Sequence, residues 1–512
     1  MAYNGFAIDA YLDAAALTKQ LDEMIKMPIY GILPDALQMY EEEYFEKKCA
    51  GSKAMIDEAK DIIPGGVQHN LAFNFPFPIV ITKAEGAKLW DIDGNEYYDL
   101  LQAGGPTVLG SNPAVVREKV IELLNTCGPS TGLFHEYEYK LAKKISDLVP
   151  SVEMFRMLGS GTEACMCAAR VARLRTGKKN ILKMGGAYHG WSDQMAYGIR
   201  IPGTKDILAR GVPKSVFAHT NEFFPNDLED LEKKLKRNQR AGGTAAVYLE
   251  PMGPESGTRP VSREFVRGCE ELAHKYGALL IFDEVVTGFR IGMSGAQGYF
   301  GVDPDLTIFG KVIAGGYPGA GGIGGHRDCM KHLGAGIESS GKKVKKALCG
   351  GTMAATPISC VAGFHTIEEI ERTGACEKAG RMADRLTAGI RASAEKYDLP
   401  FVIFNQGSIC HVVTAGTMHF AIDWRKPWQL PKILKETSRR QKEMEYMGAA
   451  YTAEGIVTLA GSRLYTSAAY DETMIDDVIA RFDRIFASCG NVDRLRAVRK
   501  KQERQHDTNG SI

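Results

Sequence analysis

Two short apolar runs near the middle of the chain, each followed by a charged residue, constrain the fold most. The first run, 278–282, leads directly into Asp283, and the second, 306–309, leads into Gly310 and then Lys311. Such runs are typical of buried parallel strands, and residues that follow parallel strands lie at one edge of an open sheet, where α/β proteins bind ligands. The pattern therefore predicts a shared site. Taken singly, Asp283 could cap a helix and Lys311 could be a solvated charge.

Alternating strand-like and helix-like segments predict an α/β protein with two domains. The sequence from 110 to 349 alternates apolar strands with helices, which favours a mostly parallel sheet with helices on both faces. We expect this large domain to interrupt a smaller, discontinuous α+β domain formed by 51–109 and 350–490. A helical extension, 1–50, and a polar tail, 491–512, complete the predicted organisation. The expected strands are 181–184, 245–249, 279–282 and 306–309 in the large domain and 401–404 and 411–414 in the small one, before a final helix at 474–487.

Proline, glycine and asparagine mark turns in the first part of the small domain. A helix from residue 59 should end at the Pro-Gly-Gly run 64–66, because proline and glycine stop helices. Apolar runs at 79–81 and 87–90 predict two strands, and Asp-Gly-Asn at 93–95 predicts a hairpin turn. We expect this stretch to be scaffold rather than chemistry.

Composition limits the classes of function. With 512 residues, of which 44% are hydrophobic and 24% charged, the chain fits a globular protein with more than one core. Its formal net charge of +1 gives no electrostatic reason to expect nucleic acid or an anionic membrane as a partner. The 11 cysteines have no zinc-site spacing, and Cys165 and Cys167 are expected to be small buried apolar residues of a helix. No apolar run reaches membrane-spanning length and no secretory leader is recognisable, so we expect a reduced, cytoplasmic protein without a metal.

The segments 283–290 (DEVVTGFR) and 310–316 (GKVIAGG) resemble the signature of the class III aminotransferases. Within that family they look closest to the glutamate-1-semialdehyde aminomutase branch, and the resemblance extends from about residue 51 to 487. It implies the fold type I architecture, pyridoxal 5'-phosphate as cofactor, and Lys311 as the lysine that forms the Schiff base. It also implies that Asp283 pairs with the pyridine nitrogen and keeps it protonated, so that the ring can accept electrons.

A glycine-rich turn before a helix is the predicted phosphate site. Ser160, Gly161 and Thr162 lie between an apolar run and the helix-favouring segment 168–174. Glycine lets the backbone approach an anion, hydroxyl groups donate to it, and a helix N-terminus adds a favourable dipole. No lysine follows at the spacing of a Walker loop, and by itself the turn could be an ordinary N-cap. Its resemblance to the family's GSGTEA phosphate cup implies that these three residues hold the cofactor phosphate.

The resemblance implies further contacts of the cofactor and substrate. Tyr188 and His189 belong to a turn similar to the family's YHG turn, which implies that Tyr188 lies over one face of the ring and that His189 is a positioning residue. Val285 is then expected to pack on the opposite face. Glu250, in a segment similar to the family's EPxxxxxG, is assigned to the cofactor neighbourhood and Glu255 to the substrate side. Either glutamate could instead only cap the next turn.

The segment 350–357 is similar to the family's GTxxxNP segment, in which the threonine reaches the phosphate of the neighbouring subunit. The resemblance implies that Thr352 completes an active site at a subunit interface and that the enzyme is a homodimer. The alternative is that Thr352 only caps the following helix. A small-molecule amine or amino acid and a keto or aldehyde compound are the expected partners, with neither nucleic acid nor a membrane.

The resemblance is weaker at the positions that would contact substrate. Aminomutases carry an arginine shortly after the Pro-Gly-Gly-Val turn, whereas 68–70 here is Gln-His-Asn, and 102–105 also departs from the family's usual residues. Loss of a bidentate carboxylate clamp changes substrate choice but not cofactor chemistry. Arg463 is a candidate substitute clamp, or else a member of a structural ion pair. We therefore predict an aminotransferase; the alternatives are an intramolecular amino transfer of the glutamate-1-semialdehyde type, an amino-acid racemase on the same scaffold, and a non-catalytic relative.

Overall fold

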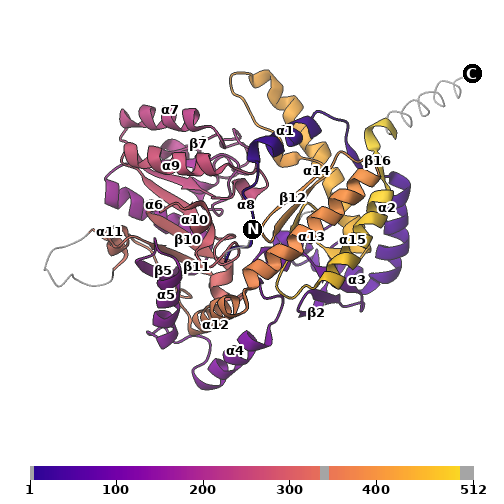
Figure 1. The fold of residues 1–512 in the computed structure, drawn as a ribbon, viewed down its shortest axis with the longest axis horizontal. Helices are drawn as coiled ribbons and strands as arrows, with labels where there is room; N and C mark the ends of the chain where they lie inside the picture. Colours follow the sequence, from indigo (N-terminus) through magenta and orange to yellow (C-terminus); the bar gives the residue numbers. More distant parts are fainter. Residues whose placement is uncertain (1–4, 335–344, 460, 496–512) are drawn as a thin grey trace, which may run out of the picture.

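A seven-stranded sheet forms the centre of the larger half of the molecule (Figure 1). The structure is a computed structural model that describes residues 5–334, 345–459 and 461–495. The strand order is β5-β11-β10-β9-β8-β6-β7. Neighbouring strands are parallel except for β11, which is antiparallel to both β10 and β5. The strands are β5 Met154–Leu158, β6 Asn180–Met184, β7 Thr220–Phe223, β8 Thr244–Leu249, β9 Leu279–Asp283, β10 Leu306–Gly310 and β11 Gly321–Gly325. The four strands expected in this region and their parallel pairing are therefore confirmed.

Helices cover both faces of this sheet (Figure 1). The helices of this half are α4 Ala114–Thr126, α5 Glu136–Leu148, α6 Gly161–Thr176, α7 Leu228–Gln239, α8 Pro254–Gly257, α9 Arg263–Lys275, α10 Gly295–Phe300, α11 Arg327–Met330 and α12 Pro357–Thr373. Tyr248 and Ile281 pack on the face covered by α6. Val247 and Leu280, which alternate with them along β8 and β9, pack on the opposite face against α7 and α9, as the two-residue period of a strand requires.

Three smaller sheets lie in the other half and join segments that are far apart in the sequence. The strands β2, β3 and β4 form an antiparallel meander, and β14 pairs in parallel with β4. A second sheet has the order β12-β13-β15, and a third pairs β1 with β16. The strands are β1 Tyr30–Ile32, β2 Ile81–Glu85, β3 Lys88–Asp91, β4 Glu96–Asp99, β12 Val402–Gln406, β13 Ile409–Val413, β14 Ile456–Val457, β15 Arg463–Tyr465 and β16 Cys489–Asn491. The β4–β14 pair joins two distant parts of the chain within one sheet.

The sheet β12-β13-β15 has one face on a large helical core and the other on the N-terminal helix. The helices of this half are α1 Ala14–Met24, α2 Pro34–Tyr40, α3 Ala50–Ala59, α13 Ala375–Lys396, α14 Leu430–Ala453 and α15 Glu472–Ala487. Cys410 and Leu464 pack against α13 and α15. Phe404 and Val413 pack against α1. The final helix expected at 474–487 is confirmed as α15.

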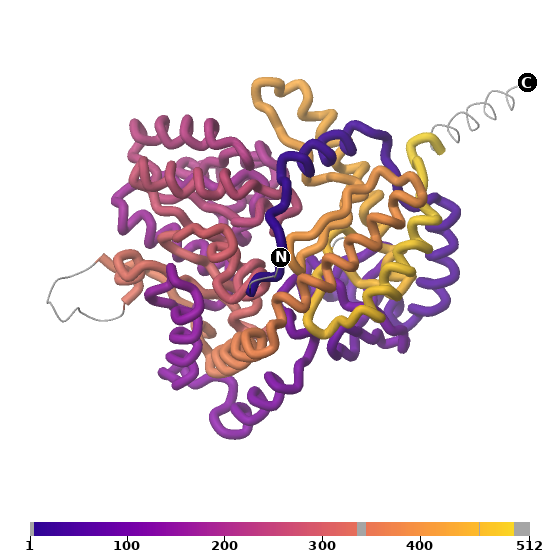
Figure 2. Tube along the Cα trace, in the orientation of Figure 1, coloured from indigo at the N-terminus to yellow at the C-terminus, as the bar shows by residue number. Residues whose placement is uncertain are grey.

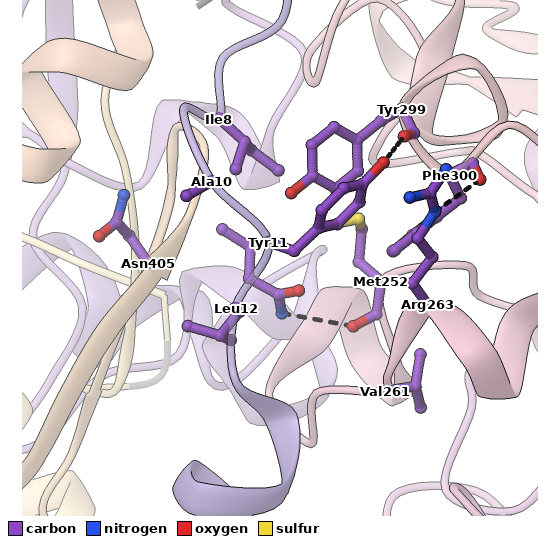
Figure 3. Close-up of a pocket in the computed structure, with 11 residues that line it drawn as sticks. Ile8, Ala10, Tyr11, Leu12, Met252, Val261, Arg263, Tyr299, Phe300 and Asn405 are labelled. Carbon is purple, nitrogen blue, oxygen red and sulfur yellow. Dashed lines mark hydrogen bonds between the residues drawn. The ribbon is translucent and has the colours of Figure 1, made fainter. Parts of the chain in front are cut away.

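The N-terminal segment links the two halves and is not simply helical. The structure corrects the expectation for 1–50, since β1 interrupts the helices there and pairs with the C-terminal strand β16. Figure 2 shows the segment before α1 running between the two halves. The Ala7 amide donates to the Ile291 carbonyl over 2.7 Å, and the Tyr11 hydroxyl donates to the Tyr299 carbonyl over 2.6 Å. A cavity of about 30 Å³ is lined partly by this segment (Figure 3), and none of the predicted site residues lines it.

The helix predicted to run from residue 59 to the proline-glycine turn is wrong. The structure has α3 at Ala50–Ala59 instead, ending where the predicted helix begins. The Asp93 carboxylate accepts hydrogen bonds from the backbone amides of Gly51, at 2.6 Å, and Ser52, at 2.9 Å. Because Asp93 lies in a distant turn, the cap that starts α3 has no signal in the neighbouring sequence.

The first strand of the small domain is also displaced from its predicted position. The apolar run 79–81 was expected to be the strand, but β2 begins only at Ile81 and continues through a polar segment to Glu85. Ile79 and Val80 pack instead into a hydrophobic cluster with Phe45. The predicted hairpin at 93–95 is confirmed, since it connects the antiparallel pair β3 and β4.

Three remaining expectations concern the tail, the membrane and the thiols. The predicted tail at 491–512 lies outside the described residues from 496 onward, and Asn491 still belongs to β16. Within the described part of the chain, no helix has the length and apolar character needed to cross a membrane. All 11 cysteines are free thiols, and most are buried.

Candidate active site

Asp283 and Lys311 lie at the same edge of the central sheet, as predicted. Asp283 is the last residue of β9, and Lys311 directly follows β10. These strands are parallel neighbours, with Asp283 in register with Ile308. Two charged side chains that the sequence separates by a segment containing α10 are therefore carried by adjacent strand ends.

The Asp283 carboxylate is held by three hydrogen bonds. Its Oδ2 atom lies 2.7 Å from Nδ1 of His189 and accepts from the Cys165 thiol at 3.6 Å, while Oδ1 accepts from the Val285 amide at 3.1 Å. Burial lowers the pKa of His189, against the opposing effect of Asp283, so the imidazole is neutral. Since a carboxylate only accepts, Nδ1 carries the hydrogen and Nε2, which has no partner among the described residues, is an acceptor. The other oxygen lone pairs of Asp283 are left for a further donor.

Cys165, His189 and Asp283 also form a set of metal-ligand type, with ligand atoms within 4.8 Å of one another. Their separations of 2.7 and 3.6 Å are those of hydrogen bonds, whereas zinc–ligand bonds measure about 2.0–2.3 Å. Burial raises the pKa of the Cys165 thiol well above its ordinary value, with the Asp283 carboxylate as the second cause. The three side chains are therefore joined by hydrogen bonds, and the Cys165 thiol keeps its proton.

Lys311 has a largely buried, activated amine. Its pKa is lowered to about 8, first by burial and then by the nearby positive charges of Arg463 and Arg290, while Asp283 acts in the opposite direction. Lys311 makes no ion pair with any described residue. Its φ of 50° lies in the left-handed region, which is unfavourable for a lysine and is typical of residues constrained at functional sites.

The predicted phosphate-binding turn forms the N-terminus of α6. Ser160 is the N-cap, and its Oγ accepts from the Glu163 amide at 3.3 Å. A methyl group added at Gly161 would lie 2.9 Å from Val285, so the turn packs directly on the residue two positions after Asp283. Thr162 packs even more closely on Gly190, where an added methyl group would lie 2.7 Å from the Cα atom of Thr162. The turn, the segment after β6 and the end of β9 thus meet at one place, with a helix N-terminus directed at it.

Glu250 organises the loop that carries the predicted stacking residue. Its carboxylate accepts from the backbone amides of Tyr188 and Glu255, each at 2.8 Å, and from that of Ser256. Burial, and then the neighbouring Asp283 charge, raises the pKa of Glu250 to about 8, against the effect of these amide donors. The Tyr188 side chain itself is 49% exposed. Glu250 therefore fixes the backbone around the site rather than reaching into it.

Glu255 and Arg463 form an ion pair beside Lys311. Nη2 of Arg463 lies 3.1 Å from Glu255 Oε2 and 3.3 Å from the Thr258 hydroxyl. The side chains are only 20% and 13% exposed, and Nε of Arg463 has no partner among the described residues. Arg463 was interpreted either as a clamp for the substrate carboxylate or as a member of a structural ion pair. The ion pair is present, and its partner Glu255 is the other residue that was assigned to the substrate side.

Thr352 lies on an exposed loop before α12 and does not cap that helix, whose N-cap is Thr356. The adjacent Gly351 is near the first turn of α6, since a methyl group added there would lie 3.3 Å from Glu163 Oε2. The capping alternative for Thr352 is therefore wrong. Its reach to a neighbouring subunit stays a prediction.

Two residues that take part in the site were not singled out from the sequence. Cys165 was expected to be only a small buried residue, yet its thiol donates to Asp283. Arg290 was noted only as part of a motif, yet it is wholly buried beside Lys311. A charged residue in the loop directly after Asp283 was the available signal for Arg290, whereas the contact of Cys165 depends on how α6 packs beneath β9.

Comparisons with known proteins agree with this geometry. The sequence model of the family described as aminotransferase class-III matches residues 72–435. The chain is 37% identical over 450 residues to a glutamate-1-semialdehyde 2,1-aminomutase 2 of Geobacillus kaustophilus, with 85% of this chain and 98% of the relative covered. An omega-transaminase from Sphaerobacter thermophilus has a TM-score of 0.74 at 25% identity, covering 87% of this chain and 99% of that one. A transaminase with PLP bound has a TM-score of 0.73 at 25% identity, covering 86% and 97%.

Proposed function

Because this chain belongs to the class-III aminotransferase family, we propose that it is a pyridoxal-phosphate enzyme that moves an amino group between an amine or amino acid and a keto or aldehyde acceptor. The placement of Asp283 and Lys311 on adjacent strand ends, beside the N-terminus of α6, carries the proposal. Pyridoxal phosphate supplies an aldehyde that combines with amines and a protonated ring that draws electrons from the substrate carbon.

The residues of the site fit this cofactor. Ser160 to Thr162 at a helix N-terminus suit a phosphate group. Asp283, oriented by its partners, has acceptor capacity for a protonated ring nitrogen. Tyr188 and Val285 would flank the ring, and the amine of Lys311, which has no ion-pair partner among the described residues, would join the aldehyde carbon.

Lys311 would also move the proton that the reaction requires. An amine with a pKa of about 8 is partly neutral near neutral pH, so Nζ can take a proton from the substrate carbon and return it. Burial and the two flanking guanidinium groups favour this neutral form. His189, neutral and bonded to Asp283, has a positioning role rather than that of a general base.

The Glu255–Arg463 pair supports intermolecular transfer. A substrate carboxylate can replace Glu255 on Arg463, because a carboxylate and a guanidinium group bond in the same bidentate geometry. A substrate without a carboxylate leaves the pair intact. One site can thus accept two chemically different substrates in turn, as an aminotransferase must.

Intramolecular amino transfer is the second candidate. The observation in its favour is the 37% identity to a glutamate-1-semialdehyde 2,1-aminomutase. Against it stands the Gln-His-Asn run at 68–70, where we expect an aminomutase to have an arginine. A racemase on the same scaffold remains the third candidate, and the assembled lysine, aspartate and phosphate site argues against a non-catalytic relative.

We propose that the enzyme is a homodimer with Thr352 completing the site of the neighbouring subunit, in a reducing, cytoplasmic compartment. Large exposed apolar side chains support a subunit interface, because contact with water is unfavourable for them and a partner would cover them. They occur in the loop before α5, after the Tyr188 turn and beside Thr352: Leu133 (78% exposed), Phe134 (77%), Trp191 (78%), Leu348 (86%) and Met353 (58%). The free state of all 11 cysteines supports the compartment.

The assay that tests this proposal compares one-substrate and two-substrate turnover. Amine donors are screened with pyruvate and 2-oxoglutarate as acceptors, beside glutamate-1-semialdehyde alone. We expect turnover that requires both a donor and an acceptor. Turnover of glutamate-1-semialdehyde without an acceptor, and none in the screen, would instead establish the aminomutase.

A further inference from the structure

Arg290 is a wholly buried cation whose hydrogen bonds have no role in the proposed chemistry. It is 0% exposed and is the largest fully buried side chain in the described part of the chain. No ion pair joins it to a carboxylate among the described residues. Because burying an unpaired charge is costly, the contacts that Arg290 makes in compensation point to a specific role.

The side-chain hydrogen bonds of Arg290 cross from the larger half of the molecule to the smaller half. Nε and Nη2 both donate to the Gly105 carbonyl, at 3.0 and 2.8 Å. Nη1 donates to the Thr466 carbonyl at 3.0 Å and to the Ser408 hydroxyl at 2.9 Å. The guanidinium carbon lies 5.1 Å from the centroid of the Tyr465 ring. One side chain thus joins three separate segments, and two of its donors converge on a single carbonyl.

The carbonyl with two donors belongs to a strained turn. Four consecutive residues, from Gln102 to Gly105, have positive φ values of 48°, 52°, 83° and 118°. This conformation is unfavourable for Gln102 and Ala103, which carry a Cβ atom, so surrounding contacts must impose it. Asp99 holds one end by accepting from the Gln102 amide at 2.7 Å, and Arg290 holds the other.

The strained turn lies directly against Lys311. A methyl group added at Gly104 would lie 3.5 Å from Lys311 Nζ, and one added at Gly105 would lie 3.7 Å from its Cδ atom. The turn therefore borders both the stem and the amine of the lysine. No side chain at 104 or 105 fills the space beside the amine.

We propose that Arg290 is a positioning residue that holds the left-handed turn Gln102–Gly105 against Lys311, and so fixes the amine and one wall of the substrate space. The inference rests on the proposed function. The positive charge of Arg290 also contributes to the low pKa of Lys311, after burial and Arg463, so the charge and the hydrogen bonds act on the same amine.

The test compares Arg290→Lys and Arg290→Met with Arg440→Met in the cofactor-loaded enzyme. Arg440 is the control, because it is also buried and donates to the backbone carbonyls of Ala415, Ile25 and Met27. It differs from Arg290 in pairing with Glu436 at 2.9 Å, and it is not among the charges that act on Lys311. The measurements are hydrogen exchange of the peptide that contains 101–106, the pH profile of kcat, KM and Tm.

We expect both Arg290 variants to speed exchange in the turn at least tenfold and to lower kcat at least tenfold, with less change in KM. Arg290→Met removes a positive charge that lowers the pKa of Lys311, so the pH at which kcat rises should move to a higher value. Arg290→Lys keeps the charge and should leave that pH unchanged. Arg440→Met should lower Tm without changing exchange in the turn or the pH profile.

The proposal is overturned if the Arg290 variants behave as Arg440→Met does. In that case Tm would be lower, but hydrogen exchange in the turn, the pH profile and kcat would be unchanged. If Arg290→Met does not fold, the exchange and kcat of Arg290→Lys decide in the same way. A wild-type protein that stays colourless with pyridoxal phosphate would overturn the proposed function instead, so the two failures are distinguishable.

Discussion

At the scale of single residues, the Glu255–Arg463 pair is the proposed contact with the substrates. Arg463→Gln should raise the KM of a carboxylate-bearing acceptor about tenfold or more, because a hydrogen bond to a charged group contributes roughly 1.5–3 kcal/mol. Glu255→Gln should lower that KM, because the competing carboxylate is gone. Steady-state kinetics with 2-oxoglutarate and with a carboxylate-free amine check both directions. Equal KM values in both variants and the wild type would show that the pair is only structural.

The amine of Lys311 predicts the pH dependence of the rate. Its pKa is lowered from 10.5 to about 8, chiefly by burial, and only the neutral amine can accept a proton. We therefore expect kcat to rise with pH, with a midpoint near 8, and to level off above it. A midpoint near the ordinary lysine value, or no rising limb between pH 6 and 10, would contradict this account of Lys311.

The residues that the sequence predicted at the site are those in local patterns. Asp283 and Lys311 follow apolar runs whose own pattern favours buried strands, so their meeting could be predicted from the order of the elements. Cys165 and Arg290 could not be assigned in this way. Their partners, Asp283 and Gly105, are distant in the sequence and become neighbours only when the helix and the second half of the molecule are packed.

At the scale of the elements, α3 shows how a tertiary contact sets a boundary. Asp93→Ala should destabilise the protein by about 1 kcal/mol, as the loss of a helix N-cap typically does. Asp93→Asn, which keeps one acceptor oxygen, should cost less. Urea unfolding of the two variants and the wild type checks the order. Equal stability of all three would mean that the hydrogen bonds to Gly51 and Ser52 contribute nothing to the start of α3.

Buried strands were predictable where whole runs are apolar, and less so at the periphery. β8, β9 and β10 are buried along their whole length and were placed within a residue or two. β2 is mostly exposed, with a polar sequence, and its position is set by pairing with β3 rather than by its own pattern. The β1–β16 pair joins the two ends of the chain, so neither short strand has a signal in its own sequence.

At the scale of the whole molecule, the fold class is confirmed as an α/β architecture with a mostly parallel central sheet, shared with transaminases. The division into domains at 110 and 350 stays a prediction. The β4–β14 pair is consistent with a discontinuous smaller domain. The local sequence of β4 and β14 does not indicate that these distant strands pair.

The exposed apolar side chains predict the assembly. Phe134→Glu and Trp191→Glu should each shift the protein from a dimer toward a monomer, because a charge buried at an interface is costly. Light scattering coupled to gel filtration measures the mass, and Tyr139→Glu, at a side chain that is 61% exposed on α5, tests whether the effect is confined to the proposed interface. A wild-type protein that is monomeric and active at assay concentration would contradict the dimer.

The most direct test of the whole account is to identify the lysine that carries the cofactor. The protein is loaded with pyridoxal phosphate, reduced with borohydride and digested, and the modified peptide is sequenced by mass spectrometry. We predict that the label is on Lys311 and that Lys311→Ala loses both the label and the visible absorbance. A label on another lysine, such as the buried Lys183, whose amine is already bonded to three carbonyls, or no label at all, would contradict the account.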